Sequence, residues 1–209
     1  KYKRLRNNER KIMNFLVNKI VCAIGCVAKD NNSKLNAKHI AFAAMALALA
    51  VATSMIKVIK LPMGGSVTLF SMLFIVLIGY WYGIKTGLAA ALAYGVLQLL
   101  LDPYILNIPQ VLLDYILGFG ALGLSGIFSS SKHGLIKGYI VGVIGRFICS
   151  FLSGWIFFAV YTPEFFNSAI LYSIVYNGSY IGLEAAVTLV VISLPPVNKA
   201  LAYVKNNLV

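Results

Sequence analysis

The sequence is poor in charged residues, and acidic residues are the scarcest of them. Asp, Glu, Lys and Arg make up 11% of the 209 residues, and six residues in all are acidic. Hydrophobic residues reach 60%. About a quarter of an ordinary soluble domain is charged, so this composition argues against a soluble protein. It predicts an integral membrane protein.

The residues that most enzymes need are also missing or badly placed. The two histidines, His39 and His133, are expected at the cytoplasmic edge, so no His-activated nucleophile can assemble. The chain contains no HExxH, no P-loop and no glycine-rich nucleotide fingerprint. We therefore expect no catalytic residues, no metal and no cofactor. Neither a disulfide framework nor a metal-binding spacing is visible in the three cysteines, Cys22, Cys26 and Cys149.

Apolar segments separated by short turns fill the chain from about residue 37 to its end. Each is close to the ~20 residues that a membrane-spanning helix needs, and the turns between them are rich in Pro, Gly and Ser. We predict an all-α integral membrane protein, a six-helix bundle occupying residues 37–209. The expected spans are residues 39–59, 67–82, 87–101, 109–128, 138–161 and 171–190 or beyond.

Residues 1–36 differ in character and are expected to form a basic, cytoplasmic, juxtamembrane extension. Ten of the eighteen basic residues lie between Lys1 and Lys38, against two acids. Such a segment is typical of contact with anionic lipid, and nucleic-acid binding is not expected. Residues 12–28 are best interpreted as an interfacial amphipathic helix; an extra span or a cleaved signal peptide are the alternatives.

Loop charges predict the orientation. Five lysines in the connections and the C-terminal segment fall on the same side as the basic N-terminus, whereas Asp102 and Glu164 fall on the other. Lys57 and Lys60 are exceptions on the outer side. By the positive-inside rule, both termini of this multi-pass protein should be cytoplasmic. The five lysines are Lys85, Lys132, Lys137, Lys199 and Lys205.

Three expected spans each carry one ionisable residue: Asp114, Arg146 and Glu184. A charge at the centre of a bilayer helix costs about 2.5–3.5 kcal/mol, so each should face a partner or a wet cavity. Glu184 is interpreted as structural. An Asp114–Arg146 ion pair that ties two helices together is one possibility for the other two.

A binding site is the other possibility, because aromatic and polar residues accompany Asp114 and Arg146 in the outer half of the bundle. A carboxylate beside aromatic rings can hold a cationic ligand or accept hydrogen bonds from an amino-substituted ring. Four-residue steps from Arg146 place several side chains on one helix face. The accompanying residues are Tyr94, Tyr104, Tyr115, Ser150, Phe158, Tyr172 and Asn177.

The first span is crowded with alanine, which lets helices approach closely. Generic packing within the bundle and docking of another membrane protein explain this pattern equally well. The alanines are Ala41, Ala43, Ala44, Ala46, Ala48, Ala50 and Ala52.

Three stretches resemble the thiamine-specific S component (ThiT family) of energy-coupling factor (ECF) transporters. They are residues 60–69 (KLPMGGSVTL), residues 146–154 (RFICSFLSG) and residues 172–180 (YSIVYNGSY) with the trailing Glu184. The third stretch is the most specific, whereas a glycine-glycine-serine loop alone would be weak. The likeness extends over about residues 37–190 and leaves the N-terminal extension unexplained.

The resemblance implies a six-helix protein of the bacterial cell membrane that captures thiamine from outside. It would deliver the vitamin together with a transmembrane coupling subunit and two ATPase subunits, so ATP hydrolysis would reside on the partners. The implied docking face contains Ala41, Ala44 and Ala48. The implied substrate-binding residues are Tyr94, Tyr104, Asp114, Tyr115, Arg146, Ser150, Phe158, Tyr172 and Asn177.

Some positions depart from the family pattern. Asp114 replaces a usual glutamate, Ser150 stands where histidine is common, and Met45 occupies a small position of the docking face. Arg146 is lysine in some relatives, and its planar fork binds differently from a point charge. The alternatives are therefore an S component for a thiamine precursor or riboflavin, or a structural membrane subunit without a transport role.

Overall fold

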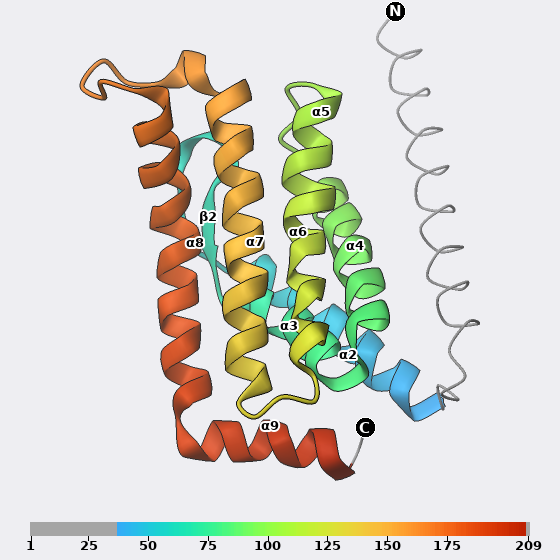
Figure 1. The fold of residues 1–209 in the computed structure, drawn as a ribbon. Helices are drawn as coiled ribbons and strands as arrows, with labels where there is room; N and C mark the ends of the chain where they lie inside the picture. Colours follow the sequence, from blue (N-terminus) through green and yellow to red (C-terminus); the bar gives the residue numbers. More distant parts are fainter. Residues whose placement is uncertain (1–36, 208–209) are drawn as a thin grey trace, which may run out of the picture.

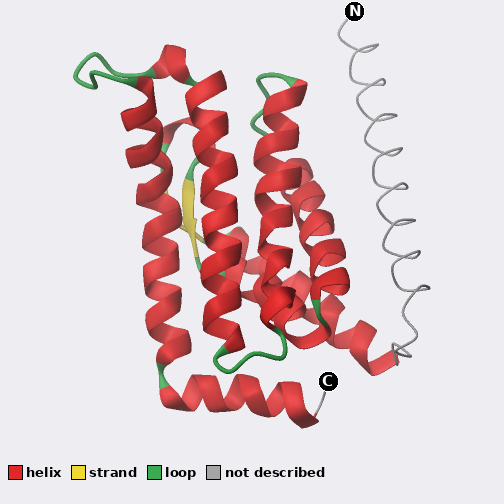
Figure 2. Ribbon diagram, in the orientation of Figure 1, coloured by secondary structure: helices red, strands yellow, loops and turns green. Residues whose placement is uncertain are grey.

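Helices dominate the computed structural model, which describes residues 37–207 (Figures 1 and 2). Residues 108–128 form one continuous rod made of several helical segments. The predicted interfacial helix at residues 12–28 lies outside the described residues. The elements are α2 (Ala37–Ser54), α3 (Ser71–Tyr82), α4 (Ile84–Leu101), α5 (Ile108–Val111), the π-helix η2 (Leu112–Leu117), α6 (Gly118–Gly120), the 3-10 helix η3 (Ala121–Phe128), α7 (Gly134–Phe157), α8 (Ala169–Ser193) and α9 (Pro195–Asn207).

The all-α membrane class is confirmed. Five helical rods are long and apolar enough to cross a bilayer: α2, α4, residues 108–128, α7 and α8. The second expected span is too short to cross the membrane. It corresponds to α3, which has 12 residues and therefore reaches only about 18 Å, less than the ~30 Å of the hydrocarbon core. The expected count of six full-length spans thus becomes five long helices and one short buried helix within the described residues.

A β-hairpin replaces the ends of the first two predicted spans. Strands β1 (Lys57–Lys60) and β2 (Ser66–Thr68) pair antiparallel, with Lys60 opposite Ser66. The first span ends at Ser54 and the second begins at Ser71, so the predicted boundaries at residues 59 and 67 were wrong. The β-branched pair Val58-Ile59 suits a strand, yet it is as apolar as the helix before it.

Glu184 joins this hairpin to the start of α3. Its Oε2 accepts hydrogen bonds from the N–H of Thr68 (3.0 Å) and from the Thr68 hydroxyl (2.7 Å). Its Oε1 accepts from Ser71 Oγ at 3.3 Å and from the N–H of Met72 at 3.4 Å. A carboxylate at a helix N-terminus satisfies orphan N–H groups and complements the helix dipole. Glu184 is therefore structural, as predicted.

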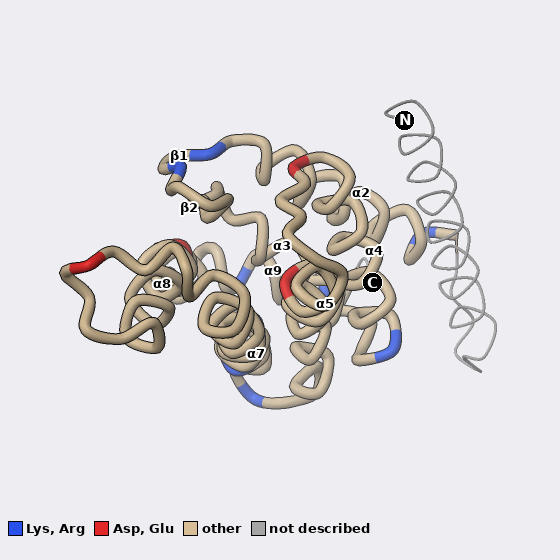
Figure 3. The backbone as a smooth tube through the Cα atoms, turned by 90° about the horizontal axis from the view of Figure 1, so that it is seen from above, with Lys and Arg blue, Asp and Glu red and all other residues tan. Residues whose placement is uncertain are grey.

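The centre of the bundle is α3, whose residues Ile75, Val76 and Ile78 are fully buried. Helices α2, α4 and α7 and the segment η3 surround it. Small residues allow the backbones of α4 and η3 to approach closely: a Cβ added at Gly123 would lie 2.6 Å from Leu88 Cα. Seen from above, charged positions are few along the described part of the chain (Figure 3).

Helix α9 was not foreseen. It runs across the end of the bundle where α2 begins (Figure 1), almost perpendicular to α7 and α8. Lys205 secures it, with Nζ 3.8 Å from the centroid of the Tyr80 ring and in hydrogen-bond contact with the carbonyl of Ser129. The other end of the bundle holds the loops next to the site.

Candidate binding pocket

A pocket lies between the hairpin, α4, the α5–α6 rod, α7 and α8. It contains about 1020 Å³ of atom-free space, counting its open mouth. Its wall is formed by Ser54, Lys57, Met63, Gly64, Gly65, Ser66, Thr68, Ser71, Tyr94, Gln98, Asp102, Tyr104, Gln110, Asp114, Tyr115, Phe119, Arg146, Ser150, Ser153, Gly154, Phe158, Tyr172, Ser173, Tyr176, Asn177 and Tyr180.

All nine residues that the sequence suggested for substrate binding line this one pocket. Tyr94, Ser150 and Asn177 are buried, and the other six are half-buried. The structure thus brings together side chains from four helices and two connections, in which Tyr104 and Phe158 lie. Their role in binding thiamine stays a prediction.

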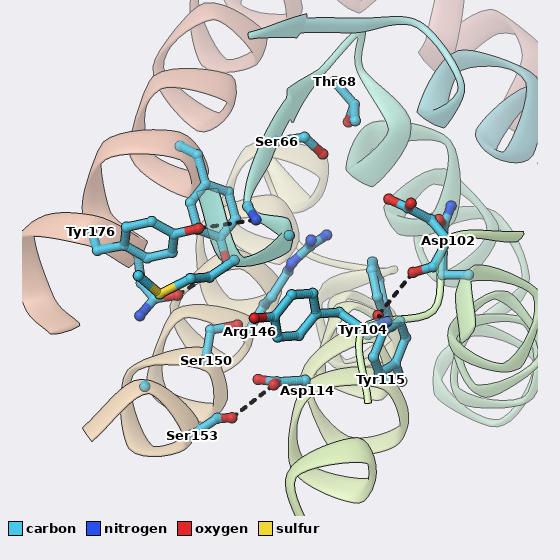
Figure 4. A pocket seen from close by; sticks show the side chains of 18 of the residues that line it. Ser66, Thr68, Asp102, Tyr104, Asp114, Tyr115, Arg146, Ser150, Ser153 and Tyr176 are labelled. Atoms are coloured by element: carbon cyan, nitrogen blue, oxygen red, sulfur yellow. Dashed lines mark hydrogen bonds between the residues drawn. The ribbon is translucent and has the colours of Figure 1, made fainter. Parts of the chain in front are cut away.

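Asp114 is held by two donors on one of its oxygens. Gln110 Nε2 and Ser153 Oγ each donate to Oδ2 at 2.7 Å, and no donor from residues 37–207 reaches Oδ1. Asp114 lies on the π-helix η2, a kind of segment that often occurs at functional sites. Figure 4 shows its carboxylate pointing into the pocket beside Ser150 and Ser153. The second oxygen is therefore available to a ligand.

The ion-pair alternative for Asp114 and Arg146 was wrong. Among the described residues, the salt bridge that forms is Lys57–Asp102, at the pocket mouth. The Arg146 guanidinium instead lies 4.1 Å from the centroid of the Phe119 ring, a cation–π contact. Arg146 extends into the space between the pocket walls (Figure 4), so both charges border the cavity.

Gln110 organises the loop at the pocket mouth and was missed by the sequence reasoning. Its side chain is 1% exposed. Besides its bond to Asp114, Nε2 donates to the Tyr104 carbonyl at 3.2 Å, and Oε1 accepts from the N–H of Leu106 at 3.1 Å. Asn107 caps the helix start by accepting from the N–H of Gln110 at 2.9 Å. Gln110 therefore couples the loop to the orientation of Asp114.

Two aromatic rings face each other at the mouth. Tyr104 and Phe158 stack with their centroids 5.7 Å apart and an interplanar angle of 28°. Tyr115 fixes the loop that contains Asp102 and Tyr104, because its hydroxyl donates to the Asp102 carbonyl and accepts from the N–H of Tyr104, both at 2.9 Å. A flat ring bound here would find π surfaces on more than one side.

A ladder of tyrosines on α8 forms the opposite wall. The ring centroids of Tyr172 and Tyr176, and of Tyr176 and Tyr180, are 5.8 Å apart. Asn177 lies between them, with Oδ1 accepting from the Tyr180 hydroxyl at 3.0 Å and Nδ2 donating to the Ser173 carbonyl at 2.9 Å. Tyr176 and Tyr180 were not among the predicted residues, although they belong to the same sequence stretch.

The turn of the hairpin packs against this ladder, and its two glycines are required for different reasons. Gly64 has φ +90°, which L side chains rarely adopt. Gly65 donates from its N–H to the Tyr176 hydroxyl at 3.0 Å, and a Cβ there would lie 2.6 Å from that oxygen. The Tyr176 hydroxyl also contacts the carbonyl of Pro62. The turn is thereby fixed against α8.

Gln98 on α4 is a second unexpected pocket residue. It is 9% exposed, and its Nε2 is buried without a hydrogen-bond partner in the described part of the chain. Buried polar groups in proteins are nearly always bonded. The two glutamines of this chain, Gln98 and Gln110, both line the pocket.

The alanines expected to form a docking face lie on the outside of the bundle. Ala41, Ala44 and Ala48 are exposed on α2 and follow one another at steps of three and four residues, which places them on one face. Ala46 and Ala50 point into the core instead. Within residues 37–207, the structure contains no group of three His, Cys, Asp or Glu side chains that could hold a metal ion.

Comparison with known proteins gives a consistent picture. The family described as Thiamine transporter protein (Thia_YuaJ) matches residues 40–203. The thiamine transporter ThiT of Bacillus subtilis (strain 168) is 32% identical over 136 residues, which cover 58% of this chain and 70% of that protein. A solved structure of ThiT from Listeria monocytogenes has the same fold, with a TM-score of 0.63 and 23% identity over 76% of this chain and 94% of the other.

Proposed function

The chain belongs to the thiamine transporter protein family, and on that premise we propose that it is the substrate-binding S component of an ECF transporter. It is a multi-pass membrane protein, and its family is one of transporters, not of enzymes. The proposed task is to capture thiamine from outside the cell and to deliver it with the help of separate subunits.

The observation that carries the proposal is that the carboxylate of Asp114 borders the pocket with one oxygen free of hydrogen bonds from residues 37–207. Thiamine is a permanent cation, because its thiazolium nitrogen is quaternary. Gln110 and Ser153 hold one oxygen of Asp114, and the other receives no hydrogen bond from residues 37–207. An oriented carboxylate in a partly dry pocket attracts a cation more strongly than one in water does. Asp114 is therefore proposed to bind the thiazolium ring.

Aromatic side chains would supply the remaining binding free energy. Tyr104 and Phe158 stack at the mouth, and Tyr172 continues the surface along α8. Such rings can cover both flat faces of a heterocycle and add cation–π attraction. Bound thiamine is proposed also to contact Asn177, Arg146 and Ser150, which line the same pocket. Tyr94 and Tyr115 shape the wall.

Transport requires an energy source, which we assign to partner subunits. The exposed alanines Ala41, Ala44 and Ala48 give α2 a smooth outer face on which another helix could pack closely. A transmembrane coupling subunit driven by two ATPases would dock there. The protein would lie in the bacterial cell membrane with both termini in the cytoplasm, so that the pocket opens outward.

A titration of the purified protein with thiamine tests the proposal. Riboflavin and the free hydroxymethyl-aminopyrimidine serve as competitors that represent the alternative vitamins. We expect thiamine to bind most tightly, because it alone combines a fixed positive charge with an aminopyrimidine. A folded protein that ignores thiamine and binds one of the competitors would overturn the substrate assignment.

A further inference from the structure

We propose that Gln98 binds the aminopyrimidine edge of thiamine with its carboxamide. This inference rests on the proposed function, because it takes thiamine as the ligand. Gln98 lines the pocket and is nine-tenths buried, yet its Nε2 has no partner among residues 37–207. An unpaired buried amide lowers the stability of the ligand-free protein. A ligand that pairs with it would recover that free energy.

The contrast with Gln110 shows that this is not a general property of glutamine in the fold. Gln110 is even more deeply buried, but its amide is used within the protein: it donates to Tyr104 and Asp114 and accepts from Leu106. Gln110 therefore has little hydrogen-bonding capacity left for a ligand, whereas the Nε2 of Gln98 is still unpaired. Two glutamines in one pocket wall thus have different roles.

The position of Gln98 suits a ligand that spans the pocket. Tyr94 and Gln98 lie four residues apart on α4, and both line the cavity together with Asp102, which directly follows the helix. In Figure 1, α4 lies beyond the α5–α6 rod from α7 and α8, the two helices that carry Ser153 and Asn177. A thiazolium ring held at Asp114 leaves the second ring of thiamine free to reach another wall.

The hydrogen-bonding groups of the aminopyrimidine make it the part of thiamine that fits a carboxamide. Its amino group and the neighbouring ring nitrogen present a donor beside an acceptor, which matches the C=O and NH2 of a carboxamide. Glutamine pairs in this two-bond manner with the corresponding edge of adenine. Rotation about the terminal bond exchanges the oxygen and nitrogen positions of Gln98 at little cost, so the side chain can present the required order.

The test compares Gln98→Met with the wild-type protein. Methionine keeps the length and apolar volume of the side chain and removes both amide groups. Leu99→Met is the matched control, because Leu99 is the next residue of α4 and does not line the pocket. Each protein is titrated with thiamine and with an analogue in which hydrogen replaces the 4-amino group.

We expect Gln98→Met to weaken thiamine binding by about tenfold to a hundredfold. The loss should be clearly smaller with the analogue, since the analogue lacks the amino group that would donate to the Gln98 carbonyl and keeps only the ring nitrogen that would accept from Nε2. The ligand-free variant should melt at or above the wild-type temperature, because a buried unpaired amide is gone. Leu99→Met should bind thiamine as the wild type does.

Two results would overturn the inference. One is a folded Gln98→Met protein that binds thiamine within about twofold of the wild type. The other is an equal loss of affinity for thiamine and for the analogue. Both leave the proposed function intact, which instead fails when the wild-type protein itself does not bind thiamine.

Discussion

Ser153 Oγ lies 2.7 Å from Asp114 Oδ2, and this hydrogen bond joins α7 to the π-helix η2 across the pocket wall. Gln110 donates to the same oxygen. Because both donors use one oxygen, they set the direction in which the other faces. The orientation of a binding carboxylate thus depends on two neutral residues.

Ser153→Ala tests this orientation. Removing one hydrogen bond to a charged group lets the carboxylate rotate, so we expect thiamine binding to weaken by about threefold to tenfold. Ser179→Ala is the control, because Ser179 is exposed on α8 and donates to the Tyr176 carbonyl. Titration of both variants checks the prediction. Equal affinity of the two variants for thiamine would show that Ser153 does not position Asp114.

Glu184→Gln tests the bridge between α8 and the start of α3. Glutamine keeps the shape but loses the charge, and its NH2 group would face the N–H and hydroxyl donors of Thr68, Ser71 and Met72. We expect a loss of about 2 kcal/mol in the free energy of unfolding, measured by thermal denaturation in detergent. Glu164→Gln, in an exposed loop between α7 and α8, should leave the melting temperature unchanged. An equal melting temperature for both variants would contradict the structural role.

Gly65→Ala tests the contact between the hairpin turn and the tyrosine ladder. The new methyl group would lie 2.6 Å from Tyr176 Oη, and overpacking of this kind costs about 1–3 kcal/mol. We expect a lower melting temperature and weaker thiamine binding. Gly182→Ala on α8 is the matched control, since its added methyl group meets nothing within 4 Å. Should both variants behave like the wild type, the turn does not need close contact with α8.

Ala44→Trp tests the proposed docking face. A large ring on the exposed side of α2 would keep a partner helix at a distance. We expect thiamine uptake by cells to fall at least about tenfold while thiamine binding by the purified variant stays normal. Ala186→Trp, on the exposed side of α8, should preserve both. Normal uptake by Ala44→Trp cells would place the docking surface elsewhere.

Rare polar residues within apolar segments made the site predictable. Asp114 and Arg146 stood out because charges in a bilayer helix are costly, and the stretch at residues 172–180 brought Tyr172 and Asn177 with them. All of them line the pocket. The neutral Gln98 and Gln110 carry no such signal in a hydropathy pattern. Their scarcity was the available clue, because the chain contains two glutamines.

The fold was less predictable where an apolar stretch can form either the end of a helix or a short strand. Val58-Ile59 continues the hydrophobic run of α2, and periodicity cannot separate a short strand from a helix end. Lys57 and Lys60 flank the pair and were treated as exceptions to the charge rule, although they mark the strand that leaves the membrane helix. Helix α9 follows Pro195-Pro196 and is held by Lys205, a contact between segments far apart in sequence.

The attraction between Asp114 and a positively charged ring is the central claim. It is tested most directly by comparing thiamine with an uncharged analogue in which carbon replaces the thiazolium nitrogen. We expect the wild-type protein to bind thiamine at least about thirtyfold more tightly than the analogue, and Asp114→Asn to reduce this preference to about threefold or less. A wild-type protein that binds both compounds equally would contradict the account.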